Sequence, residues 1–241
     1  FEYGRKMGVK IFSNSWGGDP YSQALRDVIH AGNKYGEVYV FAAGNDTQDI
    51  DQEAMYPASY EEDNLIAVAA TDNEDHLASF SNFGPLSVHV AAPGVLINST
   101  VPGKDWEVMS GTSMATPHVA GVVALLRSQE ENLTPLEIRN RLMETSDEIY
   151  NLKRRVGARG RINAYNAVHR IFLEKDPAEA LWHSEDIWVE SEHPYRAKKE
   201  VHWVLKHPGA AWVRVHFSRF TTERFDRVLI QSSNGKVVEG L

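Results

Sequence analysis

The chain has 241 residues, no cysteine, and 25 Lys and Arg against 33 Asp and Glu, which gives a net charge of −8. Without cysteine the chain can form no disulfide, no thiolate nucleophile and no cysteine metal site, and its acidic balance gives no reason to expect nucleic-acid binding. Hydrophobic residues make up 42% of the sequence, which is enough for an ordinary core, but no apolar run approaches the roughly 18 residues that a membrane span needs.

Short apolar runs alternate with helical patterns over residues 1–172. In chain order, the sequence predicts a helix over residues 1–7, a strand over 9–12, a helix over 23–35, and strands over 38–43, 65–70 and 88–91. The run over 38–43 is apolar almost throughout and is followed by Gly44. Such runs are typical of parallel strands that are buried on both faces.

Two further helices are expected downstream. Residues 112–129 are apolar, with small side chains almost all round, which predicts a helix that is buried on every side. Thr134 and Glu137 have the spacing of a capping box around Pro135, and a helix is expected from there to about Glu144. Strands that alternate with helices indicate an α/β fold with a mostly parallel sheet.

The composition changes after residue 175. Four of the six Trp and five of the ten His fall between residues 182 and 216. Strands are expected over 201–205, 211–217 and 225–231, with turn signals between or after them and no helical period. We therefore expect a first domain over 1–172, a linker over 173–181 and an antiparallel β-domain over 182–241.

The most specific segment runs from Gly111 to Gly121, with the sequence Gly-Thr-Ser-Met-Ala-Thr-Pro-His-Val-Ala-Gly. It places Ser113 at the start of the apolar helix, where unpaired N–H groups and the helix dipole favour negative charge. An oxyanion that forms beside the Ser113 hydroxyl would therefore be stabilised. The alternative reading is that Ser113 or Thr112 only caps the helix.

The segment resembles the nucleophile motif of the subtilisin-like serine proteases, the subtilases. Further segments resemble family motifs in the family's order, over residues 13–18, 41–45, 56–58, 79–84, 92–94 and 160–164. The resemblance covers residues 1 to about 172. It implies a subtilisin-like parallel sheet with helices on both faces, lacking its N-terminal part, and a serine endopeptidase that acts on extended protein or peptide substrates and needs no cofactor for its chemistry. It also implies a secreted or extracellular protein.

The resemblance implies roles for eight residues. Ser113 matches the nucleophile, and Asn45 matches the side chain that donates to the oxyanion together with the Ser113 N–H. Ser15, Trp16 and Gly17 match the edge that pairs with an extended substrate by strand addition. The last three, Gly44, Asp46 and Met55, border the pocket for the residue before the scissile bond. Asp46 there is expected to give a modest tolerance for Lys or Arg, and Met55 to make the pocket shallower.

The sequence departs from the family in one respect that decides the chemistry. A serine nucleophile needs a general base and an orienting carboxylate, but neither the Asp motif nor the His motif of the family is found. His118 is interpreted as a packed core residue. The sequence is therefore expected to be a fragment, inactive alone, with the Asp and His lying upstream. The alternative is a pseudoprotease or a non-catalytic binding module on a subtilase scaffold.

Two possible calcium sites remain. Residues 46–75 hold ten acids and no Lys or Arg, and the alternating Asp49, Asp51 and Glu53 offer hard oxygen ligands that suit structural Ca²⁺, although alternating surface acids are also common. Residues 192–228 resemble the first half of a CUB-like β-sandwich, in which Glu223 and Asp226 match an acidic calcium pair. A jelly-roll β-domain is the alternative, and the partner of this domain is left open.

Overall fold

The computed structural model describes residues 1–103, 105–173, 229–231 and 237–240. The chain divides into two compact units, Phe1–Lys175 and Asp176–Leu241. Among the described residues, none of the helices combines the length and the hydrophobicity that crossing a membrane requires.

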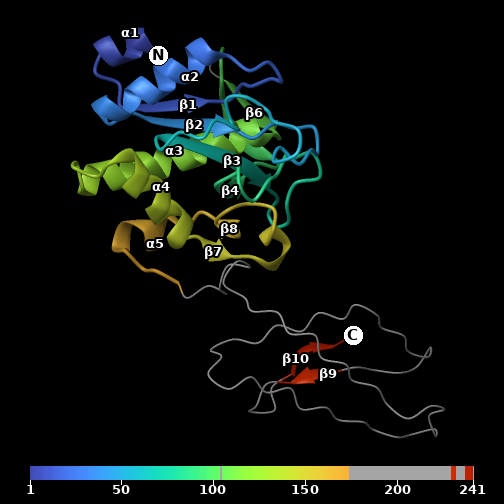
Figure 1. Ribbon diagram of the computed structural model, residues 1–241. Coiled ribbons are helices and arrows are strands. Elements are labelled where there is room, and N and C mark those ends of the chain that lie inside the picture. The colour runs from blue at the N-terminus through green and yellow to red at the C-terminus, as the bar shows by residue number, and fades with distance from the viewer. Residues whose placement is uncertain (104, 174–228, 232–236, 241) are drawn as a thin grey trace, which may run out of the picture. The chain divides into compact units, whose positions relative to one another are not determined.

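The first unit is an α/β fold around a six-stranded sheet with the order β1-β2-β3-β4-β8-β7 (Figure 1). Strands β1 to β4 and β8 run parallel, and β7 is antiparallel to β8. The strands of this sheet are β1 (Ile11–Asn14), β2 (Val38–Ala42), β3 (Leu65–Thr71), β4 (Val90–Pro93), β7 (Asp147–Glu148) and β8 (Gly160–Arg161). The helices are α1 (Glu2–Lys6), α2 (Gln23–Gly32), α3 (Thr112–Gln129), α4 (Pro135–Glu144) and α5 (Ala164–His169), with 3-10 turns η1 (Asn33–Tyr35) and η2 (Tyr150–Leu152).

The two faces of the sheet carry separate hydrophobic clusters. Alternate residues of β2 and β3 enter opposite clusters, because successive side chains of a strand point to opposite faces. One cluster contains Val38 and Val40 with Ile66, Val68 and Ala70; the other contains Tyr39 and Phe41 with Leu65, Ala67 and Ala69. Every residue of β2 and β3 is buried, as the continuous apolar runs predict.

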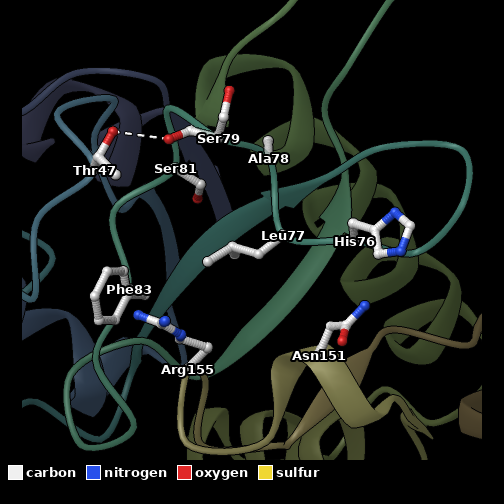
Figure 2. A pocket seen from close by; sticks show the side chains of 9 residues that line it. All are labelled: Thr47, His76, Leu77, Ala78, Ser79, Ser81, Phe83, Asn151 and Arg155. Carbon is white, nitrogen blue, oxygen red and sulfur yellow. Dashed lines mark hydrogen bonds between the residues drawn. The ribbon is translucent and has the colours of Figure 1, made fainter. Parts of the chain in front are cut away.

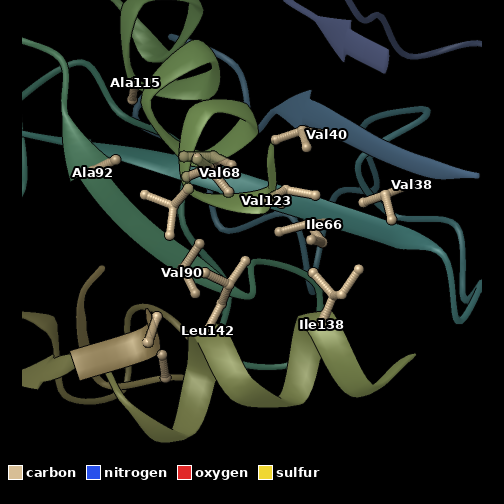
Figure 3. Close-up of a cluster of buried hydrophobic side chains, with 14 of the residues drawn as sticks. Val38, Val40, Ile66, Val68, Val90, Ala92, Ala115, Val123, Ile138 and Leu142 are labelled. Carbon is tan, nitrogen blue, oxygen red and sulfur yellow. The ribbon is translucent and has the colours of Figure 1, made fainter. Parts of the chain in front are cut away.

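Helices cover each of these clusters. Residues of α3 and α4, among them Val123, Ile138 and Leu142, pack on the face that carries Ile66 and Val68 (Figure 3). The opposite cluster includes Ile29 of α2. The predicted subtilisin-like arrangement, a parallel sheet between two layers of helices, is confirmed.

Local capping explains where two helices begin. Ser22 accepts a hydrogen bond from the Leu25 N–H at the start of α2. At α4 the predicted capping box is present: the Thr134 hydroxyl accepts from the Glu137 N–H, and the Glu137 carboxylate accepts from the Thr134 N–H at 2.8 Å. Each such cap stabilises a helix by about 1 kcal/mol.

Some elements differ from the sequence prediction. Strand β1 begins two residues later than expected, at Ile11, and the predicted strand over 88–91 begins at Val90. A two-stranded antiparallel hairpin of β5 (Ile97–Val101) and β6 (Asp105–Met109) was not expected. In the second unit, β9 (Leu229–Gln231) pairs antiparallel with β10 (Val237–Gly240); the strands expected over 201–205 and 211–217, like Glu223 and Asp226, lie outside the described residues.

The prediction that α3 is buried on every side is wrong. Its residues Ala115, Val119 and Leu126 are buried against the sheet, but Pro117, His118 and others on the far side are exposed. His118, expected in the core, is exposed, with Nδ1 2.9 Å from the Met114 carbonyl oxygen of the same helix. The reason is the helical period, which turns residue 118 away from the buried stripe.

A buried ion pair joins α1 to the start of β2. Glu37 is fully buried, and Arg5 donates two hydrogen bonds of 2.8 Å to its carboxylate. Tyr39 donates a third, at 2.5 Å. Burial alone would raise the pKa of Glu37, but the hydrogen bonds from Arg5 and Tyr39 outweigh burial, and the pKa lies below its usual value. The carboxylate is therefore charged and paired in the folded chain.

We predict that Arg5→Met destabilises the fold by about 3 kcal/mol, because the buried Glu37 charge loses its partner. Urea unfolding of the variant measures this loss. Lys6→Met is the matched control, since Lys6 is the exposed neighbour of Arg5 in α1 and its removal should cost little. Because the folded pKa of Glu37 is depressed, its contribution is complete above the unfolded pKa and is lost as pH falls through the folded one. Equal unfolding midpoints for the two variants would contradict the prediction.

Candidate active site

Three of the residues singled out in the sequence meet at the carboxyl edge of the sheet. Ser15 follows β1, Asn45 follows β2, and Ser113 is the second residue of α3. The Ser15 hydroxyl donates a hydrogen bond of 2.8 Å to the Ser113 carbonyl oxygen. Ligand sites of open α/β sheets lie at this edge, so the arrangement has the position expected of an active site.

The start of α3 is held against the end of β4 by a close crossing of two backbones. Gly111, the residue before α3, donates its N–H to the Gly94 carbonyl oxygen at 2.8 Å. A Cβ at Gly94 would lie 2.6 Å from the Cβ of Ala70 and 2.7 Å from the Gly111 carbonyl oxygen. Only glycine fits at this position, and the crossing fixes the place of the Ser113 backbone relative to the sheet.

The orientation of the Asn45 amide is determined by Thr112. Both the N–H and the hydroxyl of Thr112 donate to Asn45 Oδ1, each at 2.9 Å. The Thr112 hydroxyl also accepts from the Gly44 N–H at 3.2 Å. Since Oδ1 is the acceptor of two hydrogen bonds, Nδ2 is the donor end of the amide, and its N–H groups are left for another acceptor.

Asn45 Nδ2 and the Ser113 N–H both lie close to the same point beside Gly111. A Cβ built on Gly111 would be 3.6 Å from Asn45 Nδ2 and 3.6 Å from the Ser113 nitrogen. The Ser113 N–H belongs to the first turn of α3, which has no intrahelical acceptors for its N–H groups. Two donors at a helix N-terminus can together hold an anionic oxygen.

Asn82 holds the segment that carries Asn45, and its role was not foreseen from the sequence. Its side chain is fully buried. Its Oδ1 accepts from the N–H groups of Asp46 and Gln48 at 2.8 and 3.0 Å, and its Nδ2 donates to the Ala43 carbonyl oxygen at 3.0 Å. A buried amide with these bonds fixes both flanks of Asn45.

The residues expected to border a substrate pocket also come together. Met55 lies between two glycines: a Cβ on Gly44 would be 2.3 Å from Met55 Sδ, and one on Gly17 would be 3.9 Å from Met55 Cγ. Gly18, next to Gly17, exchanges two hydrogen bonds of 2.8 Å with Tyr56, next to Met55. These bonds bring the two chain segments side by side.

Trp16 of the predicted substrate-pairing edge and Asp46 of the predicted pocket are more exposed. Trp16 is 47% exposed and packs edge-on against Phe41, with ring centroids 5.5 Å apart. Asp46 is exposed beside Asn45. Both side chains are accessible to a ligand at this edge.

The acidic residues 49, 51 and 53, expected to hold calcium, each accept a hydrogen bond from within the described part of the chain. Asp51 accepts the N–H groups of Leu86 and Ser87 at 2.9 and 2.8 Å, Asp49 accepts the Asp51 N–H, and Glu53 accepts from Gln48. Within the described ranges no group of three or more acidic or histidine side chains is placed to hold a metal ion. Structural Ca²⁺ at these residues stays a prediction from the sequence.

Among the residues that the structure describes, no histidine or carboxylate is hydrogen-bonded to the Ser113 hydroxyl. The nearest histidine in sequence, His118, is turned toward Met114 of its own helix. His30 is paired with Glu62 at 2.7 Å, and His89 accepts the Ala67 N–H at 3.0 Å. The described site therefore contains a hydroxyl and oxyanion donors but no general base.

Comparison with known proteins gives consistent matches over the first unit. The profile described as the subtilase family matches residues 2–172. The chain is 45% identical over 166 residues to a thermophilic serine proteinase of Bacillus sp. (strain AK1), covering 69% of this chain and 39% of that protein. It is 43% identical over 166 residues to thermitase of Thermoactinomyces vulgaris, covering 69% and 56%.

Among solved structures, a mutant of the protease domain of PatA matches with a TM-score of 0.60 and 30% identity, covering 70% of this chain and 62% of that one. The chain spans only 39% to 56% of the length of the two proteinases it resembles. The matches in sequence and in structure thus agree on a subtilisin-like first unit.

We predict that Gly44→Ala destabilises the site far more than Gly103→Ala. Both glycines have positive φ, at 106° and 99°, so both substitutions carry similar backbone strain. A methyl group at Gly44 would also lie 2.3 Å from Asn82 Nδ2 and Met55 Sδ, whereas nothing lies within 4 Å at Gly103. We expect about 1 kcal/mol of unfolding free energy lost at Gly103 and at least about 3 kcal/mol at Gly44, measured by chemical unfolding. Similar losses at the two positions would refute this packing of Gly44.

Proposed function

The chain belongs to the subtilase family, and we propose that it provides the nucleophile and the oxyanion-binding groups of a serine endopeptidase. The observation that carries this proposal is the pair of donors at the start of α3. Asn45 Oδ1 is occupied by Thr112, so its Nδ2 and the Ser113 N–H are the groups available for an anionic oxygen. A developing oxyanion is the charge that such donors stabilise in acyl transfer.

The proposed reaction uses Ser113 as the covalent group. Its Oγ attacks the carbonyl carbon of the scissile peptide bond and loses its proton to a base, and the carbonyl oxygen becomes an oxyanion between the two donors. Collapse of this intermediate breaks the C–N bond, and the leaving amine takes the proton. Water then hydrolyses the acyl-enzyme by the same steps, with water as the attacking group and Ser113 as the leaving group.

The general base is proposed to come from residues outside this sequence. The Asp and His motifs of the family are not found in the 241 residues, and no described histidine contacts the Ser113 hydroxyl. A serine without its base is a weak nucleophile at neutral pH. The chain alone is therefore expected to bind peptides without cleaving them at a useful rate. The same observation supports the second candidate, a non-catalytic binding module.

We predict that Ser113 of the 241-residue chain reacts slowly with a fluorophosphonate, and that the chain alone does not degrade casein. Mass spectrometry of the tryptic peptide over residues 105–127 locates the adduct, and Ser113→Ala should abolish it. Asn45→Ala should slow labelling by about 10²-fold, the size of effect established for the corresponding amide of a subtilisin. Asn73→Ala, an exposed residue elsewhere, is the control.

Two outcomes separate the candidates. Labelling that depends on Ser113 and on Asn45 supports the endopeptidase site, because a binding module has no need of an oxyanion donor. Labelling that is absent, or equal in Asn45→Ala and Asn73→Ala, favours the binding module.

We further propose that Asp46 makes the substrate pocket tolerant of Lys or Arg. Asp46 is exposed next to Asn45, and its N–H donates to Asn82 Oδ1 at 2.8 Å, which holds its backbone beside the proposed oxyanion donor. The affinities of peptide aldehydes ending in Lys or Glu for the wild type and for Asp46→Asn test this prediction. We expect Lys to be preferred by about 2- to 5-fold, as an exposed charge pair allows, and the preference to disappear in Asp46→Asn. Equal binding of Lys and Glu by the wild type would remove the proposal.

A further inference from the structure

A second pocket, of about 320 Å³, lies beside the segment that carries Asn45 (Figure 2). It is lined by residues of three segments: Thr47, residues 76–79, 81 and 83 in the loop after β3, and residues 151 and 155 after β7. It shares no lining residue with the candidate active site. None of the sequence motifs assigns it a function.

Arg155 gives the pocket its charge. Its guanidinium lies over the ring of Phe83, 4.1 Å from the ring centroid, and Figure 2 shows the two side chains next to each other below Leu77. Arg155 is exposed, and no carboxylate pairs with it among the described residues. A guanidinium with one face on an aromatic ring keeps its five N–H donors at the edge, in the geometry that matches a carboxylate.

The rest of the lining supplies further donors and an apolar surface. The side chains of Asn151 and Ser79 are exposed and make no hydrogen bond within the described part of the chain. His76 lies near Asp72 and Glu74, at 3.5 and 3.7 Å. No residue of the lining is acidic, although the chain carries a net charge of −8.

Leu77 and Ala78 add apolar surface to this lining. A ligand with an apolar group next to a carboxylate would satisfy the guanidinium and cover this surface together. The same pocket would disfavour a cationic ligand, because Arg155 would repel it.

The pocket is connected to the candidate active site through Thr47. Its hydroxyl donates to the Ser79 carbonyl oxygen at 2.8 Å (Figure 2), and its N–H donates to the Phe80 carbonyl oxygen at 3.0 Å. Thr47 is two residues after Asn45, so the pocket lining and the oxyanion donor belong to the same short segment of the chain.

We propose that this pocket is an exosite for an acidic–apolar peptide segment, with the carboxylate of a Glu or Asp on Arg155 and a neighbouring apolar side chain on Leu77 and Ala78. The identification of the occupant as a peptide rests on the function proposed above. The pocket selects substrates by a sequence distant from the scissile bond, independently of Asp46.

Binding of two tetrapeptide amides to the full chain tests the proposal: acetyl-Gly-Phe-Glu-Gly-amide and its Gln analogue. Nuclear magnetic resonance titration gives both the affinity and the place of binding. We expect the Glu peptide to shift the signals of residues 76–83 and 151–155 and to bind about 5-fold more tightly than the Gln peptide. Arg155→Gln should remove that difference, and Arg154→Gln, its exposed neighbour, should preserve it.

Two further variants keep the test decisive. Arg155→Lys retains the charge but loses the planar donors, so the preference for Glu should fall only in part. Asn151→Asp places a carboxylate in the pocket and should weaken the Glu peptide selectively, even if Arg155→Gln proves unstable in thermal unfolding. Equal affinity for the two peptides, or shifts confined to other residues, would overturn the proposal. Ser113→Ala should bind the Glu peptide unchanged, so failure of the protease proposal would leave this result standing.

Discussion

Burial of both faces of the sheet is the constraint on which the rest of this structure depends. Every side chain of β2 and β3 is buried, and all but Ala42 and Thr71 lie in one of the two hydrophobic clusters. A polar group is costly to bury there unless it is hydrogen-bonded: the Tyr39 hydroxyl donates to Glu37, and Thr71, whose hydroxyl has no partner among the described residues, stands at the very end of β3. Chemistry is therefore confined to the ends of the strands. Residues 15, 45 and 94, which follow β1, β2 and β4, all lie at the carboxyl edge, and α3 brings Ser113 to them.

The same constraint explains how much of the fold could be predicted from the sequence. Strands β2 and β3 and helices α3 and α4 leave local patterns, a continuous apolar run or a capping box, that need no knowledge of tertiary contacts. The hairpin of β5 and β6 leaves none, because every residue of its two strands is exposed or only partly buried and burial therefore imposes no period on them. Strands β7 and β8 have two residues each, which is too short for any period.

The residues of the candidate site likewise fall into those that could be predicted from the sequence and those that could not. Ser113 and Asn45 lie in contiguous segments that resemble family motifs, so each could be singled out from sequence. Asn82 could not be given its role, because its hydrogen bonds reach back 39 residues to Ala43, and only the folded chain brings the two together. His118 was expected in the core from its place in the family motif, but the residues of α3 that are buried against the described part of the chain do not include it.

The two bonds from Thr112 to Asn45 have a consequence for the entropy of binding. Because Oδ1 is fixed by the residue directly before Ser113, the amide and the serine backbone form one rigid piece, and the rotamer freedom of Asn45 is lost when the chain folds. Immobilising such a side chain at the moment of association typically costs about 0.5–1.5 kcal/mol. A ligand that arrives here meets a donor whose direction is already set, so none of its binding free energy is spent in turning the amide.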